Sequence, residues 1–481
     1  MPEQNERPYP PRRRRRRRRR RVNYTAIIFW LAVVLVLVGI VAAVLTLSKP
    51  GPGDETTGPS GTTAPTTAPT TQPTTEPTTE STGPTDPPPV TKVTTATVGA
   101  TGDMVMHMPC VEPALNTTTG VYDFQPYFRY MQDYVNAVDY AVANLETTLA
   151  GGDYVHSDGK VGYRGYPSFN CPDEIVTSLQ SSGFDMLLTA NNHTYDTGSG
   201  GFHRTQQVIQ NAGMDYTGTI GSTDTANYLI RDINGVKIGM ICYTFETNPD
   251  PDKIALNWGA TMRETDAPLI NTFFVDDLAP FYDEMEDNVA AMKGDGAEAI
   301  VLFIHWGAEY QLKPNSSQKN IAQEMCNRGV DVIVGSHPHV IQPVDLLTSN
   351  TNPEHKTVCL YSTGNCLSNQ RLGLISSIST AHTEDGVFFS FSFAKYSDGT
   401  VRLEDVKLLP LWVNKHKNSA TGKNTYDIIP LDKQIEDWKT QFDLTSSTLS
   451  QAENSYDRTM ALVGEGMQKI QQYLKNLPEI I

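Results

Sequence analysis

The sequence predicts an α/β domain that is preceded by one transmembrane helix and a disordered linker. Three observations lead to this prediction: a long apolar run near the N-terminus, a Thr/Pro-rich segment after it, and alternating strand-like and helical patterns from about residue 94 onwards. With 481 residues, the chain has room for one large domain or for two to three domains of about 100–200 residues each. Six cysteines without a CxxC pair argue against a disulfide scaffold and a structural zinc knuckle.

The N-terminal region predicts a membrane anchor and its orientation. No charged residue occurs from Val22 to Ser48, and the apolar run is longer than the roughly 7–15 residues of a signal-peptide core. Arg12–Arg21 precede the run directly, so the positive-inside rule places residues 1–21 in the cytoplasm and the bulk of the chain outside the cell. We therefore expect a single-pass protein of the cell membrane, with residues 22–48 as its transmembrane helix. The alternatives are a cleaved signal peptide and, for the arginines, a tail that binds lipid or nucleic acid.

The charge of the chain argues against nucleic acid as a partner. Residues 1–21 carry a charge of +9, and because the whole chain carries −16, the rest carries −25. A nucleic-acid-binding protein would present positive charge on its folded part. The folded part of this chain is acidic, so we expect no nucleic-acid partner.

Composition divides the chain outside the membrane into three parts. Residues 49–92 repeat Thr-Thr-x-Pro, which favours an extended, polyproline-like linker. Residues 93–430 are expected to form the main domain, and residues 431–481 a helical C-terminal extension. From Leu449 to Leu477, apolar residues recur every three or four positions, which predicts a helix that docks on the core. A helix for self-association is the alternative.

Seven β-branched, apolar runs predict strands, and four amphipathic runs between them predict helices. The strand candidates are Thr95–Gly99, Val138–Ala143, Asp185–Thr189, Lys237–Tyr243, Ala299–Ile304, Val330–Gly335 and Thr357–Ser362. The helix candidates are Pro172–Ser182, Gly201–Ala212, Pro280–Met292 and Ser316–Arg328. This alternation predicts an α/β fold with buried strands. The later runs Val387–Ala394 and Val401–Leu409 favour antiparallel pairing.

The cysteines are expected to be structural. Cys242 lies in a strand candidate and Cys326 in a helix candidate, so we expect both to be small buried hydrophobes. Cys359 and Cys366 are close in sequence and on the extracellular side, so they are either buried thiols or a disulfide. None of the four is in a context that is typical of a nucleophile.

Polar side chains follow five of the strand candidates at the point where each strand ends. These residues are Asp103, Asn144, Glu146, Asn191, Asn192, His193, His305, His337 and His339. A single histidine or aspartate after a strand is usually a surface or turn residue. Here four of the ten histidines stand at strand ends, together with two carboxylates. Because sites in α/β proteins form at the carboxyl ends of strands, we expect these residues to meet at one sheet edge.

This combination of residue types predicts a metal site. Carboxylate, amide and imidazole ligands together suit Zn, Mn or Fe ions, whereas calcium would require oxygen ligands only. The ligands are too many for one tetrahedral ion, so we expect two divalent ions, about 3.5–4 Å apart. Such a pair lowers the pKa of water and neutralises a phosphoryl oxygen, so the site predicts hydrolysis of a phosphoester. A free imidazole nearby could protonate the leaving oxygen.

Six stretches of sequence carry a family resemblance. They are Gly102-Asp103, Ala143–Thr147 (ANLET), Gly183–Gly198 (GFDMLLTANNHTYDTG), His305–Tyr310 (HWGAEY), Val334–Pro343 (VGSHPHVIQP) and Tyr361–Asn365 (YSTGN). With these motifs, the sequence resembles the CapA family of bacterial capsule (poly-γ-glutamate) synthesis proteins, whose domain is similar to the calcineurin-like metallophosphoesterases. The resemblance covers residues from about 94 to 370. It implies a sandwich of mixed sheets flanked by helices.

The resemblance implies a role for each matched residue. The implied metal ligands are Asp103, Glu146 (as the bridging carboxylate), Asn192, His305, His337 and His339, and His193 is the implied catalytic acid. Six residues are implied to line the substrate cleft, with the two arginines holding an anion: Arg164, Glu309, Tyr310, Gln342, Asn365 and Arg371. The motif D-x-H that metallophosphoesterases usually show is incomplete, because His107 stands two residues late. N-L-E replaces the usual second motif, G-D.

We therefore expect a membrane-anchored, extracytoplasmic capsule-synthesis protein with a metal-dependent, phosphoesterase-like site. The resemblance also implies two kinds of partner, namely membrane proteins of capsule synthesis and an anionic cell-envelope polymer. The alternative is a non-catalytic module that holds a polymer or a partner protein in the same cleft. The Thr/Pro-rich linker by itself would also suit a surface adhesin.

Overall fold

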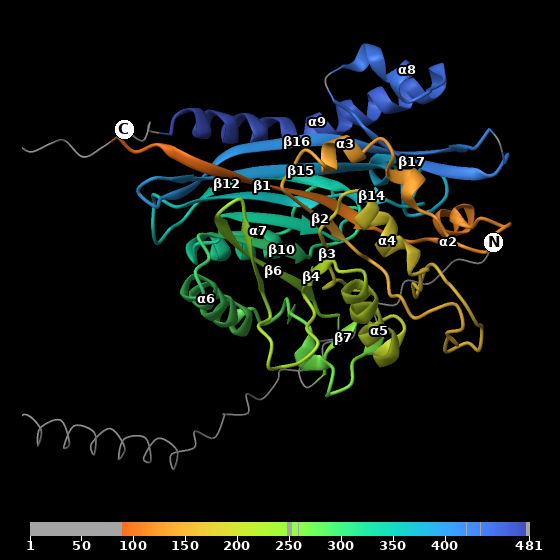
Figure 1. Ribbon diagram of the computed structural model, residues 1–481, viewed down its shortest axis with the longest axis horizontal. Coiled ribbons are helices and arrows are strands. Elements are labelled where there is room, and N and C mark those ends of the chain that lie inside the picture. Colours follow the sequence, from red (N-terminus) through yellow and green to blue (C-terminus); the bar gives the residue numbers. More distant parts are fainter. Residues whose placement is uncertain (1–88, 248–252, 258, 420, 433, 478–481) are drawn as a thin grey trace, which may run out of the picture. The chain divides into compact units, whose positions relative to one another are not determined.

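The computed structural model describes residues 89–247, 253–257, 259–419, 421–432 and 434–477 (Figure 1). The predicted cytoplasmic tail and transmembrane helix, and the predicted linker up to residue 88, lie outside these residues. Within the described ranges, no helix combines the length and the apolar character that a membrane span requires.

The first sheet has eight strands of mixed direction. Its strand order is β17 (Asn424–Pro430), β16 (Val401–Lys417), β15 (Asp385–Tyr396), β1 (Lys92–Met104), β2 (Tyr140–Asn144), β3 (Met186–Leu188) and β4 (Asp215–Thr217), and β14 (Asn365–Leu367) pairs with the end of β1. Strands β1 to β4 run parallel, whereas β15, β16 and β17 join antiparallel to them and to one another. The antiparallel pairing predicted for the two later runs is therefore confirmed.

The second sheet has seven strands and a parallel centre. Its order is β12 (Ile341–Thr348), β13 (Lys356–Thr363), β11 (Val332–Ser336), β10 (Ala299–His305), β6 (Val236–Phe245) and β5 (Leu229–Ile233), and β9 (Thr272–Phe273) pairs with β6. The four inner strands are parallel, and β12 and β5 close the two sides antiparallel. A small separate hairpin consists of β7 (Ala255–Leu256) and β8 (Ala260–Thr261).

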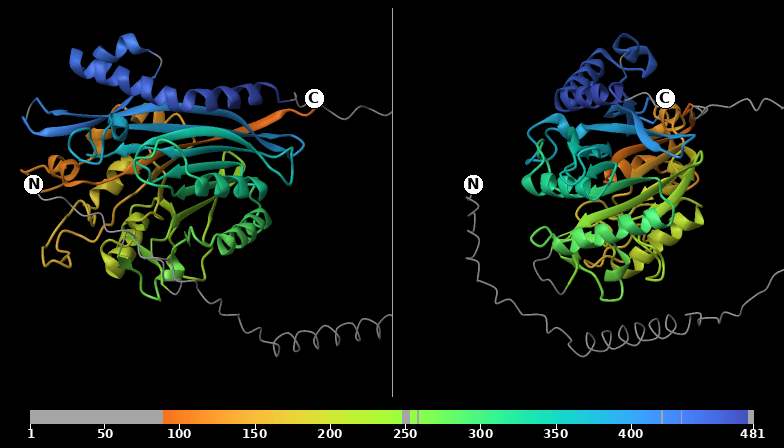
Figure 2. Two further views of the ribbon diagram at one scale, coloured as in Figure 1. Left: turned by 180° about the vertical axis from the view of Figure 1, so that it is seen from behind. Right: turned by 90° about the vertical axis from the view of Figure 1, so that its left-hand side faces the viewer.

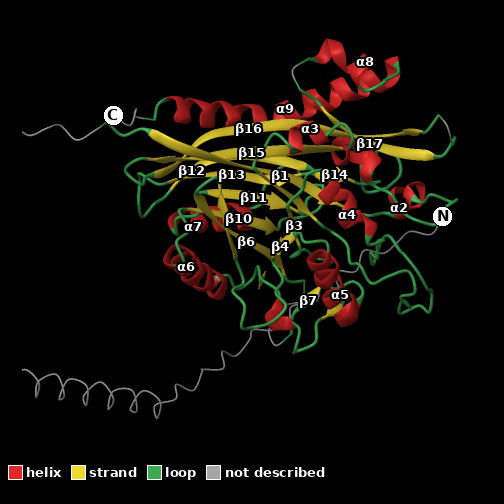
Figure 3. Ribbon diagram, in the orientation of Figure 1, coloured by secondary structure: helices red, strands yellow, loops and turns green. Residues whose placement is uncertain are grey.

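The helices lie outside the sheets, so that the strands fill the space between them (Figure 3). The helices are α2 (Met108–Val111), α3 (Gln132–Val135), α4 (Glu174–Ser181), α5 (Gly198–Asn211), α6 (Ala279–Gly294), α7 (Ser316–Asn327), α8 (Trp438–Gln441) and α9 (Ser446–Lys475). Five short 3-10 helices are η1 (Glu112–Ala114), η2 (Gln125–Phe128), η3 (Ala267–Leu269), η4 (Ala381–Glu384) and η5 (Ile435–Asp437). Apolar residues of α4 pack on the first sheet, and those of α6 and α7 on the second.

The two sheets pack face to face, and the alternation of side chains along each strand explains how (Figure 2). On β2, Val142 points into the core between the sheets, and Ala143 points to the outer core under the helices. On β10, Val301 likewise points into the core between the sheets, and Leu302 points to the outer core under the helices. Strands that are apolar at every position are therefore buried on both faces, as expected for the parallel part of an α/β fold.

Helix α9 packs against both sheets, as its apolar stripe predicts. It lies along β16 (Figure 1), and its residues Val463 and Ile470 join the core between the sheets. Gly466 faces β12 so closely that a Cβ atom there would lie 1.8 Å from the carbonyl oxygen of Val344. Glycine is therefore required for the helix to approach this strand. The predicted docking of the C-terminal helix on the core is confirmed.

The seven predicted strands and four predicted helices are all present, with ends that differ by a few residues. One prediction needs correction. The strand ends do not share the edge of one sheet, because β1, β2 and β3 belong to the first sheet and β10 and β11 to the second. Of the two alternatives for Cys359 and Cys366, the structure has buried thiols, since all six cysteines are free and buried. Burial of Cys242 and Cys326 is confirmed.

Candidate metal centre

The predicted metal ligands come together although they belong to two sheets. Because the sheets face each other, the carboxyl ends of β1 and β2 lie opposite those of β10 and β11. The six predicted ligands are all buried: Asp103, Glu146, Asn192, His305, His337 and His339. The structure therefore brings together side chains that are up to 236 positions apart in the sequence.

Two overlapping groups of side chains could hold a metal ion. Glu146, His337 and His339 form one group. The other group has Asp103, Glu146 and His305. Within each group, one ligand atom of every residue lies within 4.8 Å of the others. Glu146 belongs to both groups and thus has the position that a shared carboxylate needs.

Glu146 provides the clearest sign that the cluster suits a cation. Its side chain is 0% exposed, and neither carboxylate oxygen accepts a hydrogen bond from any residue that the structure describes. The Nε2 atoms of His305 and His339 lie 3.6 and 3.7 Å from Glu146 Oε1. Two ligands that each bind one ion at about 2.0–2.2 Å lie at such separations. Because an unpaired buried carboxylate is costly, a divalent cation is the partner that fits these atoms.

The two histidines after β11 lie in an unusual backbone conformation. His337 has φ 96° and His339 has φ 56°, a left-handed region that non-glycine residues rarely adopt. The turn is held by the backbone N–H of His337, which donates to Asp103 Oδ2 at 3.1 Å. Tyr310 supports it from outside, because its N–H donates to the carbonyl oxygen of Pro338 at 2.8 Å. Strain of this kind is typical of functional sites, where surrounding contacts fix the geometry.

Hydrogen bonds orient the other ligands. Asn144 Nδ2 donates to Asp103 Oδ1 at 2.7 Å, which fixes that carboxylate. His305 Nδ1 is 2.9 Å from Ser336 Oγ, and its Nε2 is 2.7 Å from Asn192 Oδ1. The rings of His305 and His337 converge, with 3.1 Å between Nε2 of the first and Nδ1 of the second. Such support from neighbouring groups is common around metal ligands.

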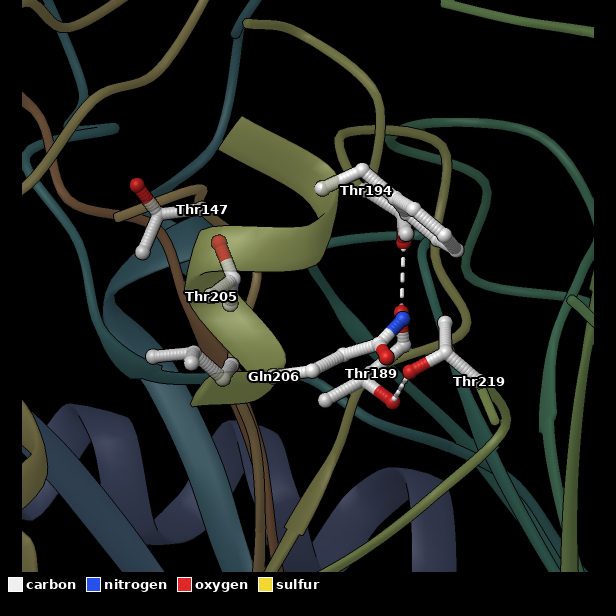
Figure 4. A pocket seen from close by; sticks show the side chains of 8 residues that line it. Thr147, Thr189, Thr194, Thr205, Gln206 and Thr219 are labelled. Atoms are coloured by element: carbon white, nitrogen blue, oxygen red, sulfur yellow. Dashed lines mark hydrogen bonds between the residues drawn. The ribbon is translucent and has the colours of Figure 1, made fainter. Parts of the chain in front are cut away.

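The loop that carries Asn192 and His193 is held from below by a layer of threonines. Thr194 Oγ1 donates to the carbonyl oxygen of Thr189 at 2.6 Å, and Thr189 Oγ1 is 2.8 Å from Thr219 Oγ1. Figure 4 shows these side chains and Gln206 of α5 around a small cavity of about 10 Å³. That space is the size of one water molecule. Because Thr194 directly follows His193 and also accepts from the backbone N–H of Asn191 at 3.0 Å, these bonds fix the loop on both sides of the two site residues.

His193 is paired with a buried carboxylate. Its Nδ1 lies 2.7 Å from Asp196 Oδ2, and its Nε2 lies 4.0 Å from Glu146 Oε1. Asp196 also accepts hydrogen bonds from the backbone N–H of Phe169 at 2.7 Å and from Asn257 Nδ2 at 2.7 Å. With Nδ1 turned toward Asp196, Nε2 faces the cluster of ligands. This is the arrangement that a general acid beside a metal centre needs.

The pKa values of the cluster reflect buried groups whose charges do not cancel. Burial, and next the charge of Asp103, raise the pKa of Glu146 well above its ordinary value. Burial, and next the neighbouring His337, lower the pKa of His305 well below its ordinary value. Burial lowers the pKa of His339 as well, but the negative charges of Glu146, Asp103 and Glu309 and the hydrogen bond with Asp103 together outweigh it and raise that pKa to about 9. A cation would favour the ionised carboxylates and neutral imidazoles, so its binding would release protons.

A cleft of about 380 Å³ opens beside the cluster. Four predicted site residues line it, namely His193, Glu309, Tyr310 and His339. His107 lines it as well. The pKa of His107 is lowered to about 4 by burial and by His339. His107 lies in neither group of candidate metal ligands.

The other four predicted cleft residues are bound elsewhere. The guanidinium of Arg164 pairs with Asp158, and that of Arg371 pairs with Glu384 at 2.6 Å. The side chain of Gln342 donates to the carbonyl oxygen of Gln311 and accepts from Gln318. None of the three is among the described residues that line the cleft.

Asn365 lies behind His339 and is not among the described residues that line the cleft. Its Oδ1 lies 3.2 Å from His339 Nδ1, and its Nδ2 donates to the carbonyl oxygen of the same histidine. It also donates to the carbonyl oxygen of Thr383 at 2.9 Å. Asn365 therefore fixes His339 from behind.

Sequence reasoning gave no role to Asp196 and missed the aromatic wall of the cleft. Asp196 follows His193 by three positions, and this spacing in the sequence could have indicated that the two side chains pair. The wall includes Phe169, whose ring meets the ring of His193 edge-on at 4.6 Å between centroids, and Tyr166. No sequence pattern marks these two residues, because they lie in an irregular loop between β2 and α4.

The fold and the site define an α/β protein in which two facing sheets hold a buried candidate metal centre. Residues 97–370 match the family described as Bacterial capsule synthesis protein PGA_cap. Since this match covers more than half of the chain, the chain belongs to that family, and the predicted CapA-type membership is confirmed.

Two relatives of this chain are both named CapA. The chain is 27% identical over 254 residues to the Capsule biosynthesis protein CapA of Bacillus anthracis, covering 50% of this chain and 54% of that protein. It is 25% identical over 335 residues to the PGA biosynthesis protein CapA of Bacillus subtilis (strain 168), covering 66% of this chain and 76% of that protein. The chain thus spans about half the length of the first relative.

Proposed function

We propose that this protein acts in capsule biosynthesis as a metal-dependent phosphoesterase of the calcineurin-like type. The observation that carries the proposal is Glu146, a fully buried carboxylate with no hydrogen-bond partner among the described residues, at the centre of two ligand groups. Family membership supports the role in capsule synthesis. The two facing mixed sheets support the metallophosphoesterase-like sandwich.

The residues divide the work of the proposed reaction. Glu146 with His337 and His339 would hold one divalent ion, and Asp103 and His305 with the same Glu146 would hold a second. When bound, Mn, Zn or Fe ions would supply positive charge for a phosphoryl oxygen and a water of lowered pKa.

His193 is the proposed general acid, with Asp196 as the residue that orients it. A proton at Nε2 of His193 would be directed toward the cluster, since Nδ1 is turned to Asp196 at 2.7 Å. Such a proton can pass to the leaving oxygen. The edge-on ring of Phe169 fixes the plane of the imidazole.

The site is proposed to work outside the cell. The uncharged apolar run at residues 22–48 and the arginines before it support a single-pass anchor with a cytoplasmic N-terminus. Membrane proteins of capsule synthesis and an anionic polymer such as poly-γ-glutamate are the proposed partners. The names of the two relatives mention capsule biosynthesis and PGA biosynthesis, which supports a role in that process.

The second candidate function is a binding module that uses the same metal site without turnover. It is favoured by the two departures from the usual phosphoesterase motifs, namely the late His107 and the N-L-E stretch around Glu146. His107 lines the cleft but belongs to neither group of ligands.

The test combines metal content with hydrolysis. The purified full-length chain is expected to contain divalent metal by elemental analysis and to hydrolyse bis-p-nitrophenyl phosphate with Mn or Zn. His337→Ala is expected to lose both, and His416→Gln, which alters a half-exposed histidine on β16, is the matched control that keeps both. Metal without hydrolysis would favour the binding module. A His337→Ala protein that keeps its metal and its activity would contradict the assignment of the site.

A further inference from the structure

The cleft beside the candidate metal centre has walls of aromatic and aliphatic side chains. Beyond the histidines, six of the lining residues are apolar or aromatic, namely Val105, Tyr166, Phe169, Tyr310, Leu374 and Ile375, and four are polar, namely Glu309, Asn369, Gln370 and Ser377. These residues come from loops far apart in the sequence. An apolar wall that reaches the reacting centre favours an apolar part of a ligand at that place.

Large apolar side chains at the mouth of the cleft are exposed to solvent. Tyr166 is 76% exposed and Leu374 is 58% exposed, and both line the cleft. Leu372, two positions before Leu374, is 53% exposed. Exposed apolar groups that gather around a cleft mark a binding surface more often than scattered ones do.

The charge of the cleft is unsuited to a polyanion. Among the described residues that line it, Glu309 has the one carboxylate, and none has a lysine or arginine side chain. The arginines that we expected to hold an anion are bound to carboxylates, Arg164 to Asp158 and Arg371 to Glu384. Away from the proposed ions, a second phosphate or a run of carboxylates would meet the charge of Glu309 with no lysine or arginine among the described lining residues, so we place the anionic polymer partner outside this cleft.

We propose that the substrate is an amphiphilic phosphodiester, in which one phosphoryl group joins an apolar chain to a second alcohol. This inference rests on the proposed phosphoesterase function. The phosphoryl group would lie at the ligand cluster, and the apolar chain would lie against Tyr166 and Leu374. In the reaction, water adds its oxygen to phosphorus, the bond from phosphorus to one ester oxygen breaks, and a proton passes to that oxygen to give an alcohol.

The experiment compares two soluble probes that differ only in the apolar chain. Hexyl p-nitrophenyl phosphate and methyl p-nitrophenyl phosphate share a leaving group, so their kcat/KM values report the contribution of the chain. With the full-length protein, we expect kcat/KM to be roughly tenfold or more higher for the hexyl ester, through KM. Tyr166→Ser and Leu374→Ser are each expected to lower the ratio of the hexyl to the methyl kcat/KM roughly threefold to tenfold.

A matched control separates the cleft from general effects of surface apolarity. Val161→Ser removes a side chain that is 63% exposed and is not among the described residues lining the cleft, so the preference should persist. Equal kcat/KM values for the two esters would overturn the inference and leave the phosphoesterase proposal intact.

A binding measurement covers the case of no turnover. If neither ester is hydrolysed with any metal, the phosphoesterase proposal fails, and calorimetric binding of hexyl phosphate against methyl phosphate then decides about the cleft. Tighter binding of hexyl phosphate that is lost in Tyr166→Ser and Leu374→Ser supports an amphiphilic ligand. Equal binding of the two phosphates would overturn the inference. The same holds if Tyr166→Ser and Leu374→Ser bind hexyl phosphate like the wild type and only bind lipid vesicles more weakly.

Discussion

Two carboxylates that are buried to the same degree have opposite surroundings. Glu146 is 0% exposed and Asp385 on β15 is 1% exposed. Asp385 accepts hydrogen bonds from Ser455 Oγ at 2.6 Å and from Arg458 Nε and Nη2 of α9 at 2.9 and 2.7 Å. Glu146 accepts none from the described residues. Burial raises the pKa of both groups, but the bonds from Arg458 and Ser455 oppose the shift at Asp385, whereas the charge of Asp103 adds to it at Glu146.

The difference separates a carboxylate that holds the fold together from one that is arranged for a ligand. When one partner of a buried ion pair with complete hydrogen bonds is removed, the folded protein loses much of its stability. A buried carboxylate without partners weakens the metal-free fold, so its removal should cost function and leave the fold stable. Each of these statements can be tested.

The largest expected effect is the loss of activity in Glu146→Ala. Since both ligand groups lose a member, we expect hydrolysis to fall by roughly 100-fold or more. The metal-free variant should be at least as stable as the metal-free wild type, because a buried unpaired carboxylate has been removed. Phosphodiesterase assays and urea titrations measure the two quantities. A metal-free variant that is clearly less stable would mean that Glu146 has a structural role.

The next effect is the loss of stability when metal is chelated. An ion present at about 100 times its dissociation constant stabilises the folded state by about 2.7 kcal/mol, so a chelator should lower the Tm of the wild type. The same treatment should leave the Tm of Glu146→Ala unchanged. Scanning calorimetry with and without chelator gives the comparison. Equal shifts in the two proteins would show that the stabilising ion binds elsewhere.

A somewhat smaller effect is expected for Asp385→Asn. The change leaves Arg458, which is 24% exposed, without its charged partner, so we expect the free energy of unfolding to fall by about 2 kcal/mol. Metal content should be unaffected. Asp405→Asn on β16, whose side chain is 41% exposed, is the matched control and should change stability by less than about 0.5 kcal/mol. Urea titrations of the three proteins decide between these outcomes.

The smallest expected effect is a pH-dependent contribution of His416. Its Nε2 lies 2.8 Å from Asp427 Oδ2, and this partner raises the pKa of His416 above 6.5. The stabilisation is therefore complete below about pH 6.5 and is lost as the pH rises through the higher, folded-state pKa. His416→Gln should be about 0.5 kcal/mol less stable than the wild type at about pH 5.5 and equal to it at about pH 9.5. A difference that persists at high pH would point to packing instead.

The sequence predicts the strands and most of the metal ligands for a simple reason. A buried strand has a clear apolar pattern, and the polar residue directly after it, such as Asp103 or His305, must lie at the end of that strand. The division of these ends between two facing sheets does not follow from such patterns. It depends on how the strands pair, and pairing joins residues that are far apart in the chain.

Side-chain partners are the part that sequence reasoning could not predict. Arg164 and Arg371 are candidates for holding an anion by their residue type, and each has a carboxylate partner that only the fold reveals. The left-handed conformations of His337 and His339 also have no sequence signal, since non-glycine residues rarely adopt them. Tyr166 and Leu374 lie in loops without a regular pattern.

The contact between Gly466 and Val344 has a consequence for dissecting the protein. Because α9 contacts β12 of one sheet and β15 and β16 of the other, it lies over the seam between the two layers. A truncated protein that stops at residue 430 would uncover the partners of Val463 and Ile470 along that seam. Recombinant fragments should therefore keep residues up to at least Lys475. A bulky residue in place of Gly466 should separate α9 from β12 and so have a similar but weaker effect.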